Sequence, residues 1–412
     1  MIFHIDVNSA YLSWTAVKRL EEGETTDIRK IPCIVGGDKK SRHGIVLAKS
    51  IPAKKYGIVT GEPVVNALKK CPNLEIVPPE HDYYHLQSSK LMNLLRSYTP
   101  DIEQVSVDEC YMDFTGIQNM YESSLKAAYE IKDKVKKSFG FTVNIGISDV
   151  KVLAKMASDF EKPDKVHTLY KHEIREKMWS LPIEELFMAG KSSVDTLHKL
   201  GIFTIGQLAQ SPVNILETHL KSHGRTLWEY ANGIDDSVVN PIIEDLKGVG
   251  NSVTLPNDLD NIEEIEKVLL MLSEKVAGRL RAGKQLAKTV AVEIKYNDFT
   301  KTSKQTTFEG QTDSGTEIYQ LSKELFSRVW SGKPVRLLGV RTSNLMAKGA
   351  PAQMSIMELF NENRTDVGKK FGNALSREKL RKLDAALDEI KDKYGKDAIS
   401  RASLLKNKKT ED

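Results

Sequence analysis

The stretch QVSVDECYMDF, residues 104–114, places two acids side by side inside an apolar run, Asp108 and Glu109. Successive residues of a regular strand point to opposite faces of a sheet. One of the two carboxylates would then face the core, where a charge without a partner is costly. A tight turn between two short strands would let both side chains reach the same side. A surface hairpin tip, where aspartate is common, would also explain the pair.

Asp6 lies near the end of a predicted strand, residues 2–7, and a helix follows at once with Asn8 or Ser9 as its N-cap. A strand-end carboxylate beside free backbone N–H groups suits a metal-bound phosphate, because the acid holds Mg²⁺ and the helix start holds phosphate oxygens. Three carboxylates on neighbouring strands can hold two Mg²⁺ ions ~3.5–4 Å apart, the arrangement for in-line phosphoryl or nucleotidyl transfer. This chemistry alone does not separate a polymerase, a cyclase and a nuclease.

The composition describes a large globular protein. A chain of 412 residues is too long for one ordinary core and predicts about three units. The longest apolar runs fall short of a membrane span, and the N-terminus lacks the pattern of a signal peptide. The three cysteines have spacings that fit neither a disulfide framework nor a zinc site, so we expect a cytoplasmic protein without membrane association. The net charge of +4 favours a polyanionic partner.

The pattern of the chain changes several times along its length. Residues 1–170 mix helices with short strands, which predicts an α+β sheet domain. Residues 172–235 are wholly helical, with glycine turns between short helices, and a linker is expected at 236–247. Residues 248–346 form a second α+β unit, and a charged helix ends near residue 394.

Two apolar patterns in the second half are regular enough to predict which side chains share a face. Period-two alternation in a strand at 288–298 places four of them together: Val290, Val292, Ile294 and Tyr296. The tail helix carries a stripe that predicts a docking face: Leu380, Leu383, Leu387 and Ile390.

Four motifs carry a family resemblance: HIDVNSAY, SVDECYMDFTG, VNIGISDVKVLAKMASDFEKPD and GNSVTLPNDL. Together and in this order they closely resemble the Y-family translesion DNA polymerases, near the bacterial DNA polymerase IV group. The resemblance covers roughly residues 1–345. It implies an α+β multidomain right hand made of a ferredoxin-like palm (1–16 and 78–170), small fingers (17–77), a helix–hairpin–helix thumb (171–235), a linker (236–247), an α+β little finger (248–346) and a tail (347–412).

The resemblance implies a template-directed, low-fidelity DNA polymerase for translesion synthesis. It would act as a monomer on primer–template DNA and a deoxynucleoside triphosphate, with two Mg²⁺ ions. No exonuclease-sized segment remains, so no proofreading is expected. Asp6 and Asp108 would hold both metals and Glu109 the catalytic one, with the Val7 carbonyl as a further ligand. The alternatives are a palm-fold nucleotide cyclase or nuclease, and a catalytically silent protein that binds DNA or a clamp.

The same resemblance assigns roles around the nucleotide. Tyr11 matches the steric gate, an aromatic ring that would clash with a ribose 2′-hydroxyl; without the motif it would be an ordinary core aromatic of a first helical turn. Ser9 and Ala10 would supply backbone N–H groups to the triphosphate. Lys162, in FEKPD, matches a triphosphate-binding lysine.

The sequence departs from the family pattern in the fingers. The pattern there is a tyrosine and, three residues on, an arginine, but this chain has Ile51 and Lys54. Ile51 cannot donate a hydrogen bond, so its role reduces to packing. Lys54 supplies charge but not the fork of a guanidinium. Ala10 is small where relatives often carry an aromatic, which predicts more room beside the nucleotide.

Two kinds of DNA contact are expected. Helical hairpins at MAGKSS and at KSHGRT (221–226) would offer backbone N–H groups to phosphates. A regular strand would put Arg336 and Arg341 on opposite faces, and a bulge near Gly339 would place both toward DNA. The basic residues implied in the little finger are Lys295, Lys301, Lys304, Arg336 and Arg341.

The tail contains the peptide QMSIM, which resembles a short motif by which bacterial polymerases dock on the sliding clamp. A hydrophobic tail folded on its own protein is the alternative, and Leu359 and Phe360 offer a second register. The implied clamp-binding residues are Gln353, Met354, Ile356 and Met357.

Overall fold

The computed structural model of the chain describes residues 1–37, 44–242, 245–349, 374–395, 398–399 and 401. Contacts within the chain separate it into two compact units, Met1–Ile243 and Glu244–Asp412. The division falls inside the segment predicted as a linker. Among the described residues, no helix combines the length and the apolar character needed to cross a membrane.

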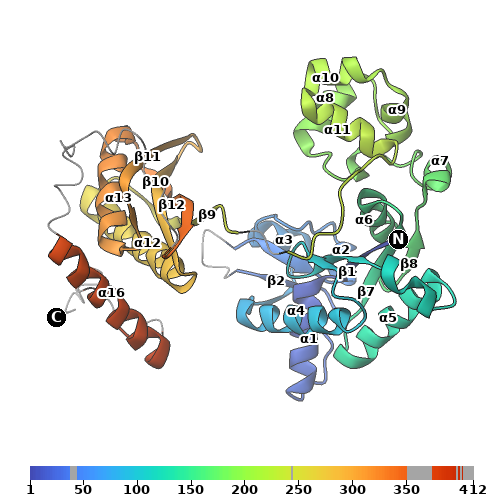
Figure 1. The fold of residues 1–412 in the computed structure, drawn as a ribbon, viewed down its shortest axis with the longest axis horizontal. Coiled ribbons are helices and arrows are strands. Elements are labelled where there is room, and N and C mark those ends of the chain that lie inside the picture. The colour runs from blue at the N-terminus through green and yellow to red at the C-terminus, as the bar shows by residue number, and fades with distance from the viewer. Residues whose placement is uncertain (38–43, 243–244, 350–373, 396–397, 400, 402–412) are drawn as a thin grey trace. The chain divides into compact units, whose positions relative to one another are not determined.

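The first unit is built on a five-stranded sheet with β1 at its centre (Figure 1). β1 is antiparallel to both of its neighbours, and β7 and β8 are parallel. The strands in sheet order are β5 (Ile102–Gln104), β6 (Glu109–Asp113), β1 (Ile2–Val7), β7 (Val143–Ser148) and β8 (Val166–Thr168).

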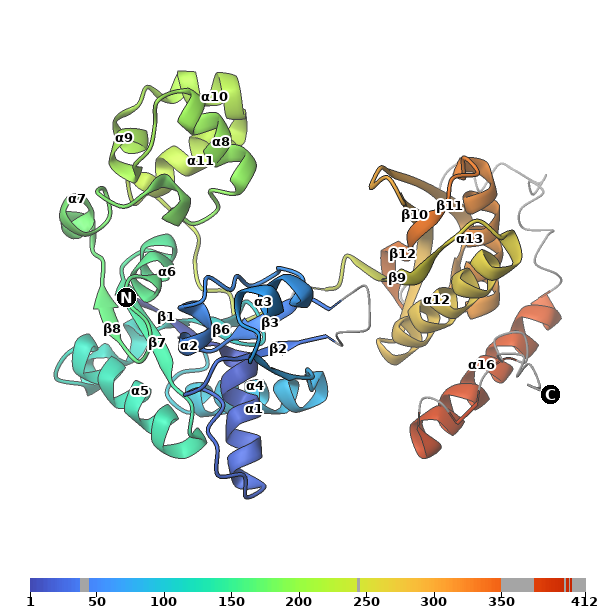
Figure 2. The ribbon, with the colours of Figure 1, turned by 180° about the vertical axis from the view of Figure 1, so that it is seen from behind.

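Alternation along β1 decides what lies on each face of this sheet. Phe3, Ile5 and Val7 belong to a core shared with α1 (Ala10–Glu21), α4 (His81–Arg96) and α5 (Ser124–Phe139). His4 lies on the other face and is hydrogen-bonded to Ser158 of α6 (Lys151–Asp159). The face of the sheet that carries His4 is therefore covered by α6, which Figure 2 shows beside β1 and β7.

Two smaller parts complete the first unit. A three-stranded sheet has the order β3 (Val46–Lys49), β2 (Cys33–Gly36) and β4 (Glu75–Val77), with α2 (Ile51–Lys54) and α3 (Val64–Lys70) beside it. The segment predicted as wholly helical has no strand, which confirms that prediction. Its longer helices are α7 (Ile174–Lys177), α8 (Lys191–Lys199), α9 (Ile205–Gln210), α10 (Val213–Leu220) and α11 (Ser222–Ala231). Three 3₁₀ turns are η1 (Thr115–Met120), η2 (Lys171–Glu173) and η3 (Ile183–Glu185).

The second unit is a four-stranded antiparallel sheet with two helices packed on one face. The residues predicted to share a face of β10 are all buried, which confirms that prediction. The elements are β9 (Gly248–Leu259), α12 (Ile262–Ala282), β10 (Gln285–Tyr296), β11 (Lys301–Thr312), α13 (Gly315–Val329), β12 (Val335–Ala347) and α16 (Ala374–Tyr394).

The predicted bulge near Gly339 is wrong. Gly339 pairs regularly with Glu293 on one side and with Ser252 on the other. In the pairing with β10, the register of β12 shifts instead between Val335 and Leu337, which leaves Arg336 as the extra residue. The shift reverses the alternation at the start of the strand, because a bulge adds one residue without adding a pair.

The tail helix α16 contacts α12 of the same unit through acidic residues. Arg281 of α12 donates two hydrogen bonds to Asp388, of 2.5 and 2.9 Å, and lies 3.6 Å from buried Asp384. Leu383, in the predicted stripe, is 51% exposed. Ile390 is also exposed, whereas Leu380 and Leu387 are half-buried, so the apolar stripe is only partly covered.

Gly146 of β7 allows α6 to lie directly on the sheet. A Cβ at this position would lie 2.0 Å from the Ala154 carbonyl oxygen and 2.4 Å from the Ser158 nitrogen, both backbone atoms of α6. We expect Gly146→Ala to destabilise the first unit by about 3 kcal/mol, the upper end for overpacking, measured as a fall in the midpoint of thermal unfolding. Gly116→Ala, which adds its Cβ in open space, is the control and should change stability by less than about 0.5 kcal/mol. Equal midpoints for the two variants would contradict this account.

Candidate active site

The register between β1 and β6 resolves the problem of the adjacent acids. Asp6 pairs with Glu109 across the two strands, and Asp108 precedes the strand in a turn. The Ser106 hydroxyl closes that turn: it donates to Asp108 Oδ1 at 2.6 Å and accepts the N–H groups of Asp108 and Glu109. The predicted hairpin bend is confirmed, and it frees Asp108 from the alternation of the strand.

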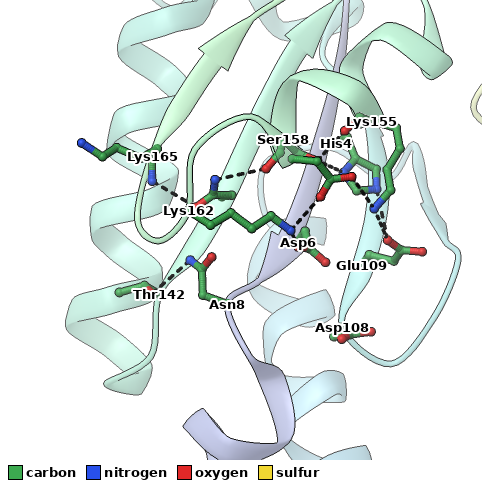
Figure 3. Close-up of polar contacts among 12 residues, drawn as sticks. His4, Asp6, Asn8, Asp108, Glu109, Thr142, Lys155, Ser158, Lys162 and Lys165 are labelled. Atoms are coloured by element: carbon green, nitrogen blue, oxygen red, sulfur yellow. Dashed lines mark hydrogen bonds and ion pairs between the residues drawn. The ribbon is translucent and has the colours of Figure 1, made fainter. Parts of the chain in front are cut away.

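Glu109 is held by side chains from β1 and α6 (Figure 3). Its Oε2 accepts a hydrogen bond of 2.8 Å from Lys155 Nζ, and His4 Nε2 lies 3.5 Å away. The Ser158 hydroxyl donates to the Lys155 carbonyl, so His4 Nδ1 must donate to Ser158. His4 Nε2 can donate to Glu109 only when the ring is protonated, and burial opposes this by lowering the pKa of His4. Protonated His4 and the Lys155 ammonium both favour the ionised carboxylate, and the pKa of Glu109 falls from 4.5 to about 2.

The other two acids have different surroundings. Asp6 forms an ion pair with Lys162, whose Nζ also lies 2.8 Å from Asp159. Burial raises the pKa of Asp108, and the like charges of Asp6 and Glu109 raise it further. One of the three carboxylates is therefore left without a lysine and repelled by the other two.

These acids provide oxygen ligands of the kind that Mg²⁺ prefers. Within the described ranges, no three acidic, histidine or cysteine side chains converge closely enough to form a closed metal centre. Asp6 and Glu109 instead turn toward the ammonium groups of Lys162 and Lys155, which occupy cation positions beside both carboxylates. Asp6, Asp108 and Glu109 lie at neighbouring positions of two paired strands, and two of them already bind a lysine. This set of carboxylates fits divalent metal ions.

A cavity of about 400 Å³ opens beside Asp6 and Asp108. We call it the carboxylate cavity. Tyr11 forms one wall and is stacked on Tyr84, with ring centroids 4.4 Å apart and planes 14° apart. This stacking fixes the ring at the cavity wall. The lining residues are Asp6, Val7, Ser9, Ala10, Tyr11, Leu47, Ala48, Lys49, Thr60 and Asp108.

A second cavity of about 400 Å³ contains the cations, and we call it the lysine cavity. Ser9 has the left-handed φ of 47° as the N-cap of α1, and it lines both cavities. The lining residues are Asn8, Ser9, Ser13, Arg29, Lys49, Ser50, Ile51, Lys54, Thr142, Lys162 and Pro163. The structure thus brings the predicted nucleotide residues together in two adjoining cavities.

The loop that carries Lys162 is braced from two sides. The Asn144 amide donates to the carbonyls of Ser158 and Glu161, at 3.1 and 2.7 Å. Asp164 accepts hydrogen bonds from Lys132 at 2.8 Å and from Lys136 at 2.7 Å, both on α5. Lys162 is therefore carried by a rigid loop.

Sequence reasoning missed Lys155, Lys49 and Arg29. Lys155 lies inside the quoted motif VLAK, one helical turn after Lys151, but nothing in helical spacing indicates a partner on β6. Lys49 shares a face of β3 with half-buried Leu47, since Val46 and Ala48 are buried. Period-two alternation was the signal that would have found it.

The predicted basic residues of the second unit do not all share a face. Lys295 and Lys301 pair with each other on the face opposite the helices, and Lys304 pairs with buried Val292 and so lies on the helix side. Lys295 and Arg336 both lie over the Phe299 ring, at 4.6 and 4.8 Å.

Arg341 lines a hollow of about 600 Å³ on the open face of this sheet. It lies over Gly250, where a Cβ would come 3.2 Å from the arginine's own Cβ. The predicted clamp residues lie outside the described residues: Gln353, Met354, Ile356 and Met357.

The depressed pKa of Glu109 depends on the cation beside it. Because the folded pKa lies below 4.5, the ionised carboxylate contributes stability above about pH 4.5, and this contribution is lost as the pH falls toward 2. We expect Lys155→Met to raise the pKa of Glu109 toward 4.5, measured by carboxyl ¹³C NMR with a chelator present. Lys151→Met is the control on the same helix, because Lys151 pairs with Glu103. A pKa near 2 in both variants would contradict the assignment.

The family models match two separate regions. The model described as the impB/mucB/samB family matches residues 5–159, and that of its C-terminal domain matches residues 246–356. A DNA polymerase IV from Clostridium acetobutylicum is 47% identical over 98% of both chains. A DNA polymerase IV from Alkaliphilus oremlandii is 37% identical over 98% of this chain and 99% of its own.

Solved structures agree in fold. A Y-family DNA polymerase chimera superposes with a TM-score of 0.72 at 24% identity, over 84% of this chain and 99% of its own. DinB from Sulfolobus solfataricus gives a TM-score of 0.55 at 22% identity, over 84% of this chain and 99% of its own. The α+β multidomain fold expected from the sequence is thereby confirmed. The chain belongs to the impB/mucB/samB family and is a member of the Y-family DNA polymerases.

Proposed function

We propose that this protein is a template-directed translesion DNA polymerase in which the carboxylate cavity carries out nucleotidyl transfer. The observation that carries the proposal is that Asp6 and Asp108 line the same cavity as the fixed ring of Tyr11 and the start of α1. In this cavity the two acids would hold metal-bound phosphate and the aromatic ring would lie against the sugar. The N–H groups at the start of α1 would bind phosphate oxygens, so the cavity suits a deoxynucleoside triphosphate.

The residues that would hold two Mg²⁺ ions are Asp6, Asp108, Glu109 and the Val7 carbonyl. When bound, the ions would lower the pKa of the attacking primer hydroxyl and neutralise the leaving pyrophosphate. Lys162 and Lys54 would bind the triphosphate from the lysine cavity. Asp159, 2.8 Å from Lys162 Nζ, keeps that ammonium in place when Asp6 turns to other ligands.

Tyr11 would select the sugar. Its ring is supported by Tyr84, which is buried and whose hydroxyl is hydrogen-bonded to Thr15 at 2.8 Å. A supported ring cannot move aside for a 2′-hydroxyl. Ala10 lines the same cavity, and its small side chain would leave more room beside the nucleotide than the aromatic that relatives often carry.

We assign residues 1–16 and 78–170 to the palm, 17–77 to the fingers and 171–235 to the thumb. The little finger would bind the DNA backbone with the open face of its sheet, through Lys295, Lys301, Arg336 and Arg341. Such contacts predict a strong dependence of DNA binding on salt. We further propose that the protein works as a cytoplasmic monomer that docks on a sliding clamp through the peptide beginning at Gln353.

Primer extension tests the carboxylates. We expect Asp108→Asn to lower the rate of Mg²⁺-dependent extension on undamaged and damaged templates by roughly 10³-fold, the scale of a lost electrostatic group. Asp113→Asn is the control, because Asp113 caps the chain after β6 through Thr115. Cyclic products or DNA cleavage would favour a cyclase or nuclease, and extension by Asp108→Asn at the unaltered rate would overturn the mechanism.

Ribonucleotide incorporation tests Tyr11. Tyr11→Ala should raise the incorporation of ribonucleotides relative to deoxynucleotides by roughly 100-fold, because the ring that would clash with the 2′-hydroxyl is removed. Tyr11→Phe keeps the ring and should keep the discrimination. Unchanged discrimination in Tyr11→Ala would exclude Tyr11 as the gate.

A further inference from the structure

The side chain of Lys49 lies where the two cavities meet. In the part of the chain that the structure describes, Lys49 and Ser9 alone line both the carboxylate cavity and the lysine cavity. Lys49 is the last residue of β3 and pairs with Ile34 of β2, so its backbone is fixed by the sheet. Its position is therefore set by the strand and not by a loop.

Three of the cations near Lys49 have carboxylate partners, whereas Lys49 and its neighbour Lys54 have none among the described residues. Arg29 binds both oxygens of Asp27, Lys70 binds both oxygens of Glu62, and Lys162 binds Asp6 and Asp159. Among the described residues, no carboxylate oxygen lies within 4.0 Å of Lys49 Nζ, and its one hydrogen bond is a long one of 3.4 Å to the Thr60 hydroxyl. The ammonium group is thus available for an anion.

Electrostatics at this position support the same conclusion. Burial lowers the pKa of Lys49 most, and the charge of Lys54 lowers it further. Glu62 opposes this shift, and Lys70 has the smallest effect. The lining of the lysine cavity contains four cations and no acid, so the cavity carries an excess of positive charge. A polyanion entering the cavity would relieve the repulsion among these lysines.

We propose that Lys49 binds the triphosphate of the incoming nucleotide, at the junction between the carboxylate cavity and the lysine cavity. This inference rests on the proposed function and deepens it. Ile51, two residues later, lines the lysine cavity but cannot donate a hydrogen bond. Lys49 supplies a cation from the same segment and, with Lys54 and Lys162, surrounds the phosphates from three elements.

The test is Lys49→Met, which keeps the length of the side chain and removes its charge. We expect the KM for a deoxynucleoside triphosphate to rise about 10-fold while kcat changes by less than about 3-fold, as for a lost charge-assisted hydrogen bond made equally in ground and transition states. Inhibition by inorganic tripolyphosphate should weaken by a similar factor. Lys49→Arg should restore both values to within about 3-fold of the original.

The control is Lys55→Met, because Lys55 is an exposed lysine at the end of α2 that lines neither cavity. Thermal midpoints of all variants separate lost binding from lost folding. If Lys49→Met keeps its KM and its inhibition by tripolyphosphate, the inference is overturned. If the unaltered protein does not extend primers at all, the proposed function itself fails. A rise in KM that Lys49→Arg does not restore would also overturn the inference, because it would point to packing and not to charge.

Discussion

Like-charge repulsion among three carboxylates is the constraint on which the first unit depends. The pairing of Asp6 with Glu109, and the turn before β6, bring the acids together where β1 ends and β6 begins. Burial and the charges of Asp6 and Glu109 raise the pKa of Asp108. A fold with this arrangement needs cations close by, and the chain supplies them from α6 and from the loop after it.

The packing of α6 on the sheet links this electrostatic requirement to the core. Gly146 lets the helix backbone lie on β7 without a side chain between them. The helix then presents Lys155 to Glu109 and Ser158 to His4, from one turn. A change in the core under α6 would therefore reach the acids directly, which explains why a residue without a side chain matters to a site of charged ones.

Much of the fold and the centre of the site follow from local patterns. The strand with Asp6, the alternating strand β10 and the run of short helices were predicted from periodicity, and their structures agree. The hairpin bend at Asp108 also followed from local reasoning, since two adjacent acids in a strand cannot share a face. Family motifs then indicated Tyr11 and Lys162, which the structure places in adjoining cavities.

The sequence by itself determined the elements, the acids and the class of chemistry, because side-chain periodicity and turn preferences act over a few residues. Only the tertiary structure decided which cation meets which acid: Lys155 is 46 residues from Glu109, and Lys162 is 156 residues from Asp6. It also placed the bulge at Arg336 and put Lys304 on the helix side of its sheet. Ion pairs, registers and cavities arise between distant segments, and no local pattern encodes the partner at the other end.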